Sequence, residues 1–248
     1  MKLLQVEGLS KKYPQFTLKD VSFSLEEGEI MGLIGKNGAG KSTTLKSILN
    51  MVYPDKGKIL IDGREFRQFE IECKQKIGVV LGGIDFYNYK KLSNITTVTR
   101  KFYHDWDDFA YQKYMQMFEL DEKKRVNQLS AGMKVKYLIA IALSHKAKLL
   151  ILDEPTSGLD PVARDDLLEL FTQLVKDGSR SILFSTHITS DLDKCANSIT
   201  YIKNGQILKT AKKEQFISYF QYLKNPDETD DLNLEEIMIR TERKTYHV

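Results

Sequence analysis

The chain has 248 residues, of which 42% are hydrophobic and 29% are charged, as in ordinary globular proteins. Its formal net charge of +3 is too small to predict nucleic acid as the main partner. Two cysteines cannot build a disulfide framework or a zinc site, which predicts a reducing compartment. No apolar stretch approaches the roughly 20 residues of a membrane-spanning helix, and residues 1–10 show no secretory signal. Composition therefore excludes membrane-spanning, secreted, collagenous and disordered chains.

Short strands are predicted in the first quarter of the chain. Residues 21–26 alternate between apolar and polar side chains, which is typical of a half-buried strand. Residues 29–34 form an apolar run, which indicates a strand buried on both faces. A turn signal at 55–57 precedes another predicted strand at 58–62.

The middle third predicts helices. Residues 94–120 contain neither Gly nor Pro and predict one long helix, with Phe109, Tyr114, Met117 and Phe118 roughly on one face. Residues 130–144 predict a second helix, so we expect an inserted helical subdomain at about 87–144. The aromatic residues at 102–114 have two interpretations, stacking on bases or forming a helical core or docking face, and the interspersed aspartates favour the second. His145 is expected at the surface, without a role.

The last third returns to alternating strands and helices. Strands are predicted at 148–152 and 181–185, a helix begins at Asp160-Pro161, and Asn204-Gly205 indicates a tight hairpin. This alternation predicts an α/β fold with a mainly parallel sheet. The acidic residues 221–248 are expected to be a tail with a short helix at 234–240, following a domain at 1–220.

A phosphate loop is predicted between the strand at 29–34 and a helical segment at 43–50. Residues 35–42 read GKNGAGKS and match G-x4-G-K-S. Glycines let successive N–H groups point at phosphate oxygens, and the following helix N-terminus favours anions. We expect Lys41 to bridge the β- and γ-phosphates and Ser42 to hold Mg²⁺. The predicted nucleotide-binding set comprises Gly35, Asn37, Gly38, Ala39, Gly40, Lys41, Ser42 and Thr43.

An apolar strand at 149–152 ends in two adjacent carboxylates, Asp153 and Glu154. The carboxyl edge of a parallel sheet would place them beside the phosphate loop. Asp153 is then expected to reach Mg²⁺, and Glu154 to act as general base for the attacking water or to orient it.

A second anion site is predicted at the start of the helix at 130–144. Residues 129–134 read LSAGMK, and Ser130 precedes Asp153 by 153 − 130 = 23 residues. Backbone N–H groups and a hydroxyl at a helix N-terminus favour an anion. One chain is poorly suited to place both anion sites against the same γ-phosphate. Two chains packed head to tail could each contribute one of the two sites.

Taken in this order, the motifs resemble those of the ATP-binding subunit of ABC transporters, over about residues 1–220. The family's LSGGQ signature appears as LSAGM, which keeps Ser130 and Gly132; residues 157–160 resemble the D-loop and end in Asp160. His187 corresponds to the switch histidine that contacts the γ-phosphate, and Tyr13 to the aromatic residue that stacks on adenine. Each residue could instead have a purely structural role. His187 could cap a helix or be buried, and Tyr13 could pack on a sheet edge. The resemblance implies a P-loop NTPase core with an N-terminal antiparallel β-subdomain.

The same resemblance implies the partners. It predicts an ATPase that uses ATP and Mg²⁺, a second nucleotide-binding subunit, and a separate multi-span permease that holds the ATPase at the cytoplasmic face of the membrane. Residues 234–238 resemble the endings of ATPases in small bacterial exporters. A soluble ABC-type ATPase acting on DNA or ribosomes is the alternative, although only 129 − 42 = 87 residues separate phosphate loop and signature, without heptads. A P-loop kinase or G protein has no use for the signature.

One position departs from the family pattern. The glutamine that contacts Mg²⁺ and the attacking water aligns with Gly82, which has no side chain to coordinate anything. Asp85 or water would substitute, and we expect coupling or turnover to be altered. Gly82→Gln should then change the ATPase rate or its stimulation by a partner. Met133 likewise replaces the signature's last amide.

Overall fold

The computed structural model describes residues 1–81, 87–226 and 228–243, so Gly82 and Asp85 lie outside the described residues. The strands are β1 (Lys2–Lys12), β2 (Thr17–Glu26), β3 (Ile30–Ile34), β4 (Lys56–Ile61), β5 (Arg64–Glu65), β6 (Ile77–Val80), β7 (Leu149–Asp153), β8 (Ser181–Thr186), β9 (Ser198–Lys203) and β10 (Gln206–Lys212). The helices are α1 (Lys41–Ile48), α2 (Glu70–Gln75), α3 (Leu92–Thr99), α4 (Asp108–Met117), α5 (Ala131–Ser144), α6 (Pro161–Val175), α7 (Thr189–Cys195), α8 (Lys213–Phe220) and α9 (Leu234–Glu242).

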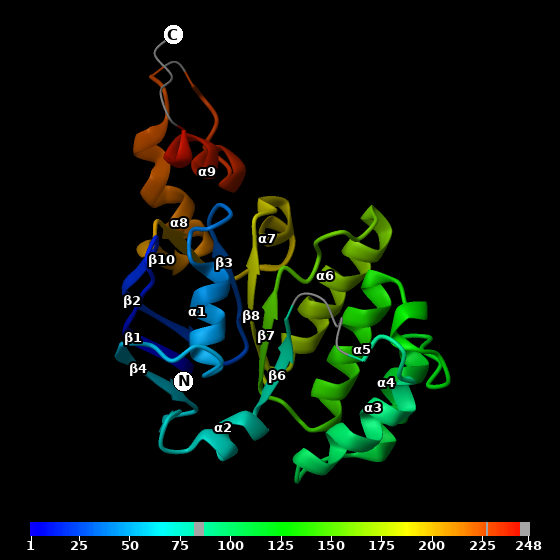
Figure 1. The fold of residues 1–248 in the computed structure, drawn as a ribbon. Coiled ribbons are helices and arrows are strands. Elements are labelled where there is room, and N and C mark those ends of the chain that lie inside the picture. Colours follow the sequence, from blue (N-terminus) through cyan, green and yellow to red (C-terminus); the bar gives the residue numbers. More distant parts are fainter. Residues whose placement is uncertain (82–86, 227, 244–248) are drawn as a thin grey trace.

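The strands form two sheets, and the predicted fold class is confirmed. An antiparallel sheet has the order β2-β1-β4-β5, and a six-stranded sheet has the order β10-β9-β3-β8-β7-β6. In the second sheet only the β9–β10 pair, joined through the predicted Asn204-Gly205 hairpin, is antiparallel. Figure 1 shows α1 between the two sheets and α3 to α6 on the far side of the six-stranded sheet.

The strands β3, β7 and β8 of the six-stranded sheet are buried on both faces, as their apolar sequences predict. Along β7, Leu149 and Ile151 join a core cluster with Leu45 of α1 and the antiparallel sheet. Leu150 and Leu152 point the other way, into the cluster that the helices α5 to α9 share. Alternation with a period of two residues thus divides one strand between two cores.

The carboxyl ends of β3, β7 and β8 meet at one edge of this sheet. Ile34 pairs with Thr186, and Asp153 pairs with Ser185, so the three strands end nearly level. The chain leaves β3 into the phosphate loop, β7 into Glu154 and β8 into His187. Parallel pairing therefore collects, at one edge, residues that are far apart in the sequence.

The single long helix predicted at 94–120 is wrong. The segment contains α3, a 3₁₀ turn at Arg100–Phe102, and then α4. Between them Asp107 caps α4 by accepting a hydrogen bond from the backbone N–H of Ala110 at 2.9 Å, while its own N–H donates to the carbonyl of Ser144 at 2.8 Å. An N-cap and a tertiary contact therefore begin a second helix within a segment that contains neither Gly nor Pro.

The predicted apolar face of that segment is also partly wrong. Phe109 is 83% exposed and Met117 is 55% exposed. The side chains that enter the core from α4 are Tyr111 and Met115, followed by Phe118, since the helix begins at Asp108 and not at residue 94. The buried side chains follow the i, i+4, i+7 spacing of one helix face, and Phe109 lies two residues from Tyr111, on the opposite face.

His145 is buried, contrary to the prediction that it lies at the surface. It is 3% exposed, and its ring stacks on Tyr103 with centroids 3.7 Å apart and an interplanar angle of 11°. Its Nδ1 donates to the carbonyl of Gln75 at 3.2 Å. One imidazole therefore joins the end of α2, the end of α5 and the segment between α3 and α4.

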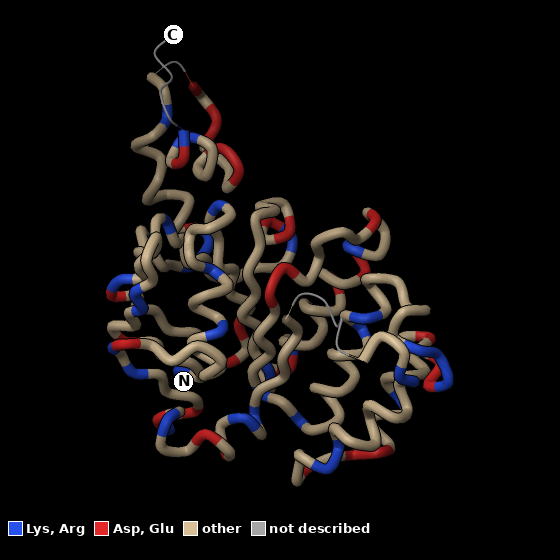
Figure 2. Tube along the Cα trace, viewed as in Figure 1, with Lys and Arg blue, Asp and Glu red and all other residues tan. Residues whose placement is uncertain are grey.

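The C-terminal residues form a packed element around the predicted helix. Asn233 and Glu236 make a reciprocal capping box at the start of α9, and Leu234 and Ile237 are buried in the same core as Tyr201. Figure 2 shows acidic residues concentrated at this end of the molecule, and opposite charges interspersed elsewhere. The domain limits at 220 and at 87–144 stay predictions.

The last turn of α9 reaches the loop that follows β3. Glu242 accepts a hydrogen bond from the Tyr201 hydroxyl at 3.0 Å, and its other carboxylate oxygen lies 3.6 Å from the Lys36 ammonium. The Lys203 ammonium donates to the carbonyl of Thr241 at 2.5 Å. The C-terminal helix is thus fastened beside the predicted phosphate loop.

Candidate functional site

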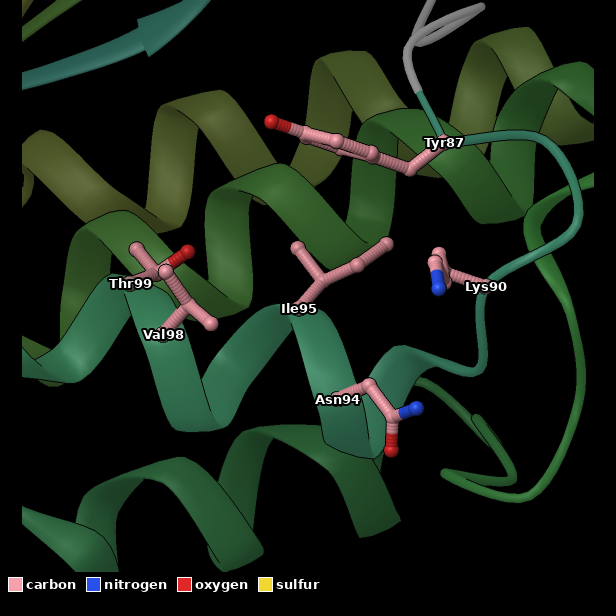
Figure 3. A pocket seen from close by; sticks show the side chains of 6 residues that line it. All are labelled: Tyr87, Lys90, Asn94, Ile95, Val98 and Thr99. Atoms are coloured by element: carbon pink, nitrogen blue, oxygen red, sulfur yellow. The ribbon is translucent and has the colours of Figure 1, made fainter.

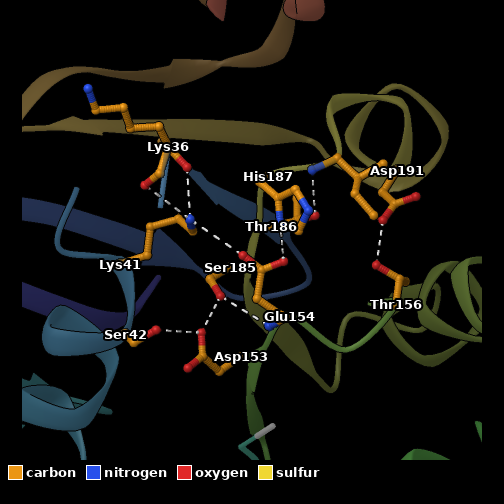
Figure 4. Close-up of polar contacts among 12 residues, drawn as sticks. Lys36, Lys41, Ser42, Asp153, Glu154, Thr156, Ser185, Thr186, His187 and Asp191 are labelled. Atoms are coloured by element: carbon orange, nitrogen blue, oxygen red, sulfur yellow. Dashed lines mark hydrogen bonds and ion pairs between the residues drawn. The ribbon is translucent and has the colours of Figure 1, made fainter. Parts of the chain in front are cut away.

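A polar cleft of about 690 Å³ opens at the carboxyl edge of the six-stranded sheet. Its lining brings together most of the residues that the sequence analysis singled out, from three separate strand ends. The described lining residues are Gln15, Phe16, Asn37, Gly38, Gly40, Lys41, Ser42, Thr43, Glu154, Ser157 and His187. Figure 4 shows the polar contacts among the central ones.

The phosphate loop opens directly into the first turn of α1. Gly40 is the N-cap, with a φ of 117° that favours glycine, and no side chain caps the helix. The first backbone N–H groups of α1 are therefore available to an anion. Lys41 is 6% exposed, and its ammonium donates to the carbonyl of Gly35 at 2.8 Å. A buried cation held by oxygen atoms is suited to receive phosphate oxygens.

Oxygen ligands suited to Mg²⁺ converge beside the loop. The Ser42 hydroxyl donates to Oδ1 of Asp153 at 3.2 Å, and the Ser185 hydroxyl donates to the same oxygen at 2.5 Å. A hydroxyl and a carboxylate are the hard oxygen donors that Mg²⁺ prefers beside phosphates. The residues present therefore fit this ion.

Glu154 occupies a constrained position between a cation and a histidine. Its φ is +51°, which is uncommon for a residue with a side chain, and its N–H donates to both oxygens of Ser185. One carboxylate oxygen lies 3.4 Å from the Lys41 ammonium, and the other is 2.8 Å from Nδ1 of His187 (Figure 4). The carboxylate is therefore aimed into the cleft, within reach of a bound phosphate or water.

The remaining predicted residues lie outside the cleft. Neither Ser130 nor Gly132 is among its described lining residues; Ser130 is exposed and caps α5 by accepting from the N–H of Met133 at 3.2 Å. Gly132 faces Leu159, whose side chain a Cβ there would meet at 3.6 Å. Asp160 is the N-cap of α6, as its position before Pro161 predicts.

Comparison with known proteins assigns the family. The family model described as ABC transporter matches residues 18–157, which is more than half of the chain. The chain belongs to the ABC transporter family. It is an ATP-binding subunit of this family and an ATP-hydrolysing P-loop enzyme.

Several ABC proteins are similar over most of the chain. The ABC transporter ATP-binding protein YtrB of Bacillus subtilis (strain 168) is 31% identical over 87% of this chain and 75% of its own length. The lantibiotic transport ATP-binding protein SrtF of Streptococcus pyogenes is 34% identical over 83% of this chain and 89% of its own. A solved ATP-binding subunit of an ABC transporter superposes with a TM-score of 0.83 at 28% identity, covering 97% of this chain and 100% of the other.

Three residues at or beside this cleft were missed from the sequence: Gln15, Phe16 and Ser185. Ser185 fixes both Asp153 and Glu154, and its signal was a hydroxyl at the end of an apolar strand. Phe16 lines the cleft, whereas Tyr13, 36% exposed, is not among the described lining residues. The centroids of the two rings lie 6.4 Å apart, so the predicted Tyr13 is a neighbour of the lining residue Phe16.

Proposed function

We propose that this chain drives export through a separate multi-span permease, as the peripheral ATPase at the cytoplasmic face of the membrane. The supporting observation is the division of the predicted site. Lys41, Glu154 and His187 share one cleft, whereas Ser130 and Gly132 lie at the start of α5, outside its described lining. A second ABC subunit, identical or related, packed head to tail would supply the missing segment to each cleft.

ATP then links the two subunits. Lys41 and the first turn of α1 hold the phosphates, the exposed hydroxyl of Ser130 from the neighbouring subunit meets the γ-phosphate, and Tyr13 with Phe16 stacks on the base. Ser42 and Asp153 would hold Mg²⁺, which supplies positive charge against the phosphates. Glu154 takes a proton from the attacking water as general base, or orients that water. His187 orients Glu154 and contacts the γ-phosphate. Loss of the γ-phosphate weakens the interface, so hydrolysis opens the pair.

Glu154→Gln tests this arrangement, because it keeps the shape of the side chain and removes its basicity. The variant should bind ATP, hydrolyse it at least 100-fold more slowly, and accumulate as a closed pair of subunits in size-exclusion chromatography with light scattering. Adding Ser130→Phe to the same variant should prevent pairing. Full activity of Glu154→Gln, or ATP-dependent pairing that ignores Ser130→Phe, would contradict the proposal.

An apolar pocket gives the permease a docking surface. The pocket has a volume of about 270 Å³ and is lined by Tyr87, Lys90, Asn94, Ile95, Val98 and Thr99 on and before α3 (Figure 3). Tyr87 is 68% exposed and Val98 is 58% exposed, which leaves apolar surface for a partner to cover. Among the described residues, no helix has the length and apolar character that crossing a bilayer requires.

The proposal of export draws its support from the names of similar proteins. The names of similar proteins include bacitracin transport for BcrA of Bacillus licheniformis, 31% identical over 84% of this chain, and lantibiotic transport for SrtF. Val98→Glu should abolish copurification of a multi-span membrane protein from solubilised membranes. Ile239→Glu, at a side chain 52% exposed on α9, is the matched control and should leave it intact. Copurification of ribosomes or DNA in place of a membrane protein would favour the soluble alternative.

A further inference from the structure

A fully buried carboxylate lies behind the site and is not among the predicted site residues. Asp191, on α7, is 0% exposed. Its Oδ2 accepts a hydrogen bond from the Thr156 hydroxyl at 2.6 Å, and its Oδ1 accepts from Nε of Arg164 at 2.5 Å. A buried charge is tolerated only when it is paired and hydrogen-bonded, so these contacts belong to one unit. Figure 4 shows the Thr156–Asp191 contact beside the cleft.

The three members of this unit each follow a residue of the proposed site. Thr156 comes two residues after Glu154, Arg164 comes four residues after Asp160, and Asp191 comes four residues after His187. The unit therefore ties together the loop after β7, the start of α6 and the segment after β8. The first two of these segments are consecutive in the chain, whereas the third is separated from them by α6 and β8.

Short backbone contacts connect the unit to the reacting groups. The N–H of Ser157 donates to the carbonyl of Glu154 at 3.2 Å, which closes the turn that contains Thr156. On the other side, the N–H of Asp191 donates to the carbonyl of Ile188 at 3.2 Å, directly after His187. A displacement of Asp191 relative to Thr156 would therefore separate Glu154 from His187, which are 2.8 Å apart.

We propose that Asp191 is a positioning residue that keeps Glu154 and His187 correctly placed relative to each other for hydrolysis. It acts on Glu154 through Thr156 and on His187 through its own helix, α7. The proposal rests on the roles proposed above for Glu154 and His187. Lys41 and the phosphate loop, which hold most of the proposed phosphate contacts, are outside the unit, so ATP binding should depend on it only weakly. Loss of the unit should lower kcat and leave KM for ATP nearly unchanged, since small misplacements of reacting groups cost rate strongly.

Thr156→Val is the decisive variant because it removes only the hydroxyl link and keeps the Arg164–Asp191 ion pair. Thr96→Val is its matched control: Thr96 is 6% exposed, Thr156 is 1% exposed, and the Thr96 hydroxyl lies 2.9 Å from each of the Tyr111 and Tyr137 hydroxyls. Both variants should lower the melting temperature by a few degrees. Only Thr156→Val should lower kcat, by about tenfold with KM within threefold, and Thr156→Ser should restore kcat.

Arg164→Lys is an independent test of the positioning role of Asp191. It keeps a positive charge beside Asp191 but cannot keep the guanidinium contacts to Asp191 and to the Ser190 hydroxyl, which lies 2.7 Å from Arg164. Its kcat should also fall at nearly constant KM. Unchanged kcat in Thr156→Val and Arg164→Lys, or an equal fall in Thr96→Val, would overturn the proposal. If Glu154→Gln stays active in the same assay, the proposed role of Glu154 itself fails, which separates the two outcomes.

Discussion

Protonation of the buried His145 should destabilise the fold as the pH falls. Burial between Tyr103 and the end of α2 lowers the pKa of His145 from 6.5 to about 4, and the hydrogen bond to Gln75 offsets only part of this. In the unfolded chain the imidazole takes up a proton near pH 6.5, whereas the folded chain resists it until about pH 4. The unfolded state therefore binds more protons in this interval, and folding stability is lost as the pH falls through it.

The size of this effect follows from the two pKa values. The difference between 6.5 and about 4 corresponds to roughly 3 kcal/mol of unfolding free energy. This contribution is fully present above about pH 7, declines between 6.5 and 4, and changes no further below 4. Other groups titrate in the same interval, so the contribution must be measured as a difference between two proteins.

His145→Phe supplies that difference, because phenylalanine keeps a ring against Tyr103 and cannot titrate. Urea unfolding of both proteins between pH 4 and pH 8 gives the two stability curves. We expect the wild type to lose roughly 3 kcal/mol more than His145→Phe between pH 7 and pH 4. The lost hydrogen bond to Gln75 should shift the variant's curve by a constant amount. Parallel curves over the whole interval would refute the reasoning.

Three further changes have defined outcomes. Lys41→Ala should abolish ATP binding measured by titration calorimetry, and retained micromolar affinity would remove Lys41 from the site. Ser185→Ala frees Asp153, so the Mg²⁺ concentration for half-maximal ATPase activity should rise about tenfold; an unchanged Mg²⁺ dependence would contradict this. Asn233→Ala breaks the capping box of α9 and should lower the unfolding free energy by about 1 kcal/mol in urea titrations, whereas equal midpoints would show that the cap is dispensable.

Features whose physical cause lies within one short segment could be predicted from the sequence. Gly40 and Lys41 lie at the N-terminus of α1 because of the local G-x4-G-K-S sequence. Asp160 caps α6 because it directly precedes Pro161. Apolar strands that end in polar residues likewise place Asp153 and Glu154 at a sheet edge. Their contacts in the cleft then follow from the parallel pairing of β3, β7 and β8.

Features that depend on contacts between distant segments could not be predicted from the sequence. The helix predicted at 94–120 is interrupted because Asp107 bonds to Ser144, and no residue type inside the segment signals this contact. The burial of His145 depends on Tyr103, which the same interruption brings to it. Ser185 acts on Asp153 only because β7 and β8 are neighbours, which a single sequence does not reveal.

The contact between Glu242 and Lys36 has a practical consequence for anyone handling the protein. Purification tags, fluorescent fusions and truncations are commonly placed at the carboxyl end, on the assumption that this end is inert. Here the last turn of α9 contacts the loop after β3 through Glu242 and Lys36, so we expect truncation of α9 or a fusion close to it to alter ATP turnover for reasons unrelated to transport. Met1, 78% exposed at the other end of the chain, is the better attachment point for a label.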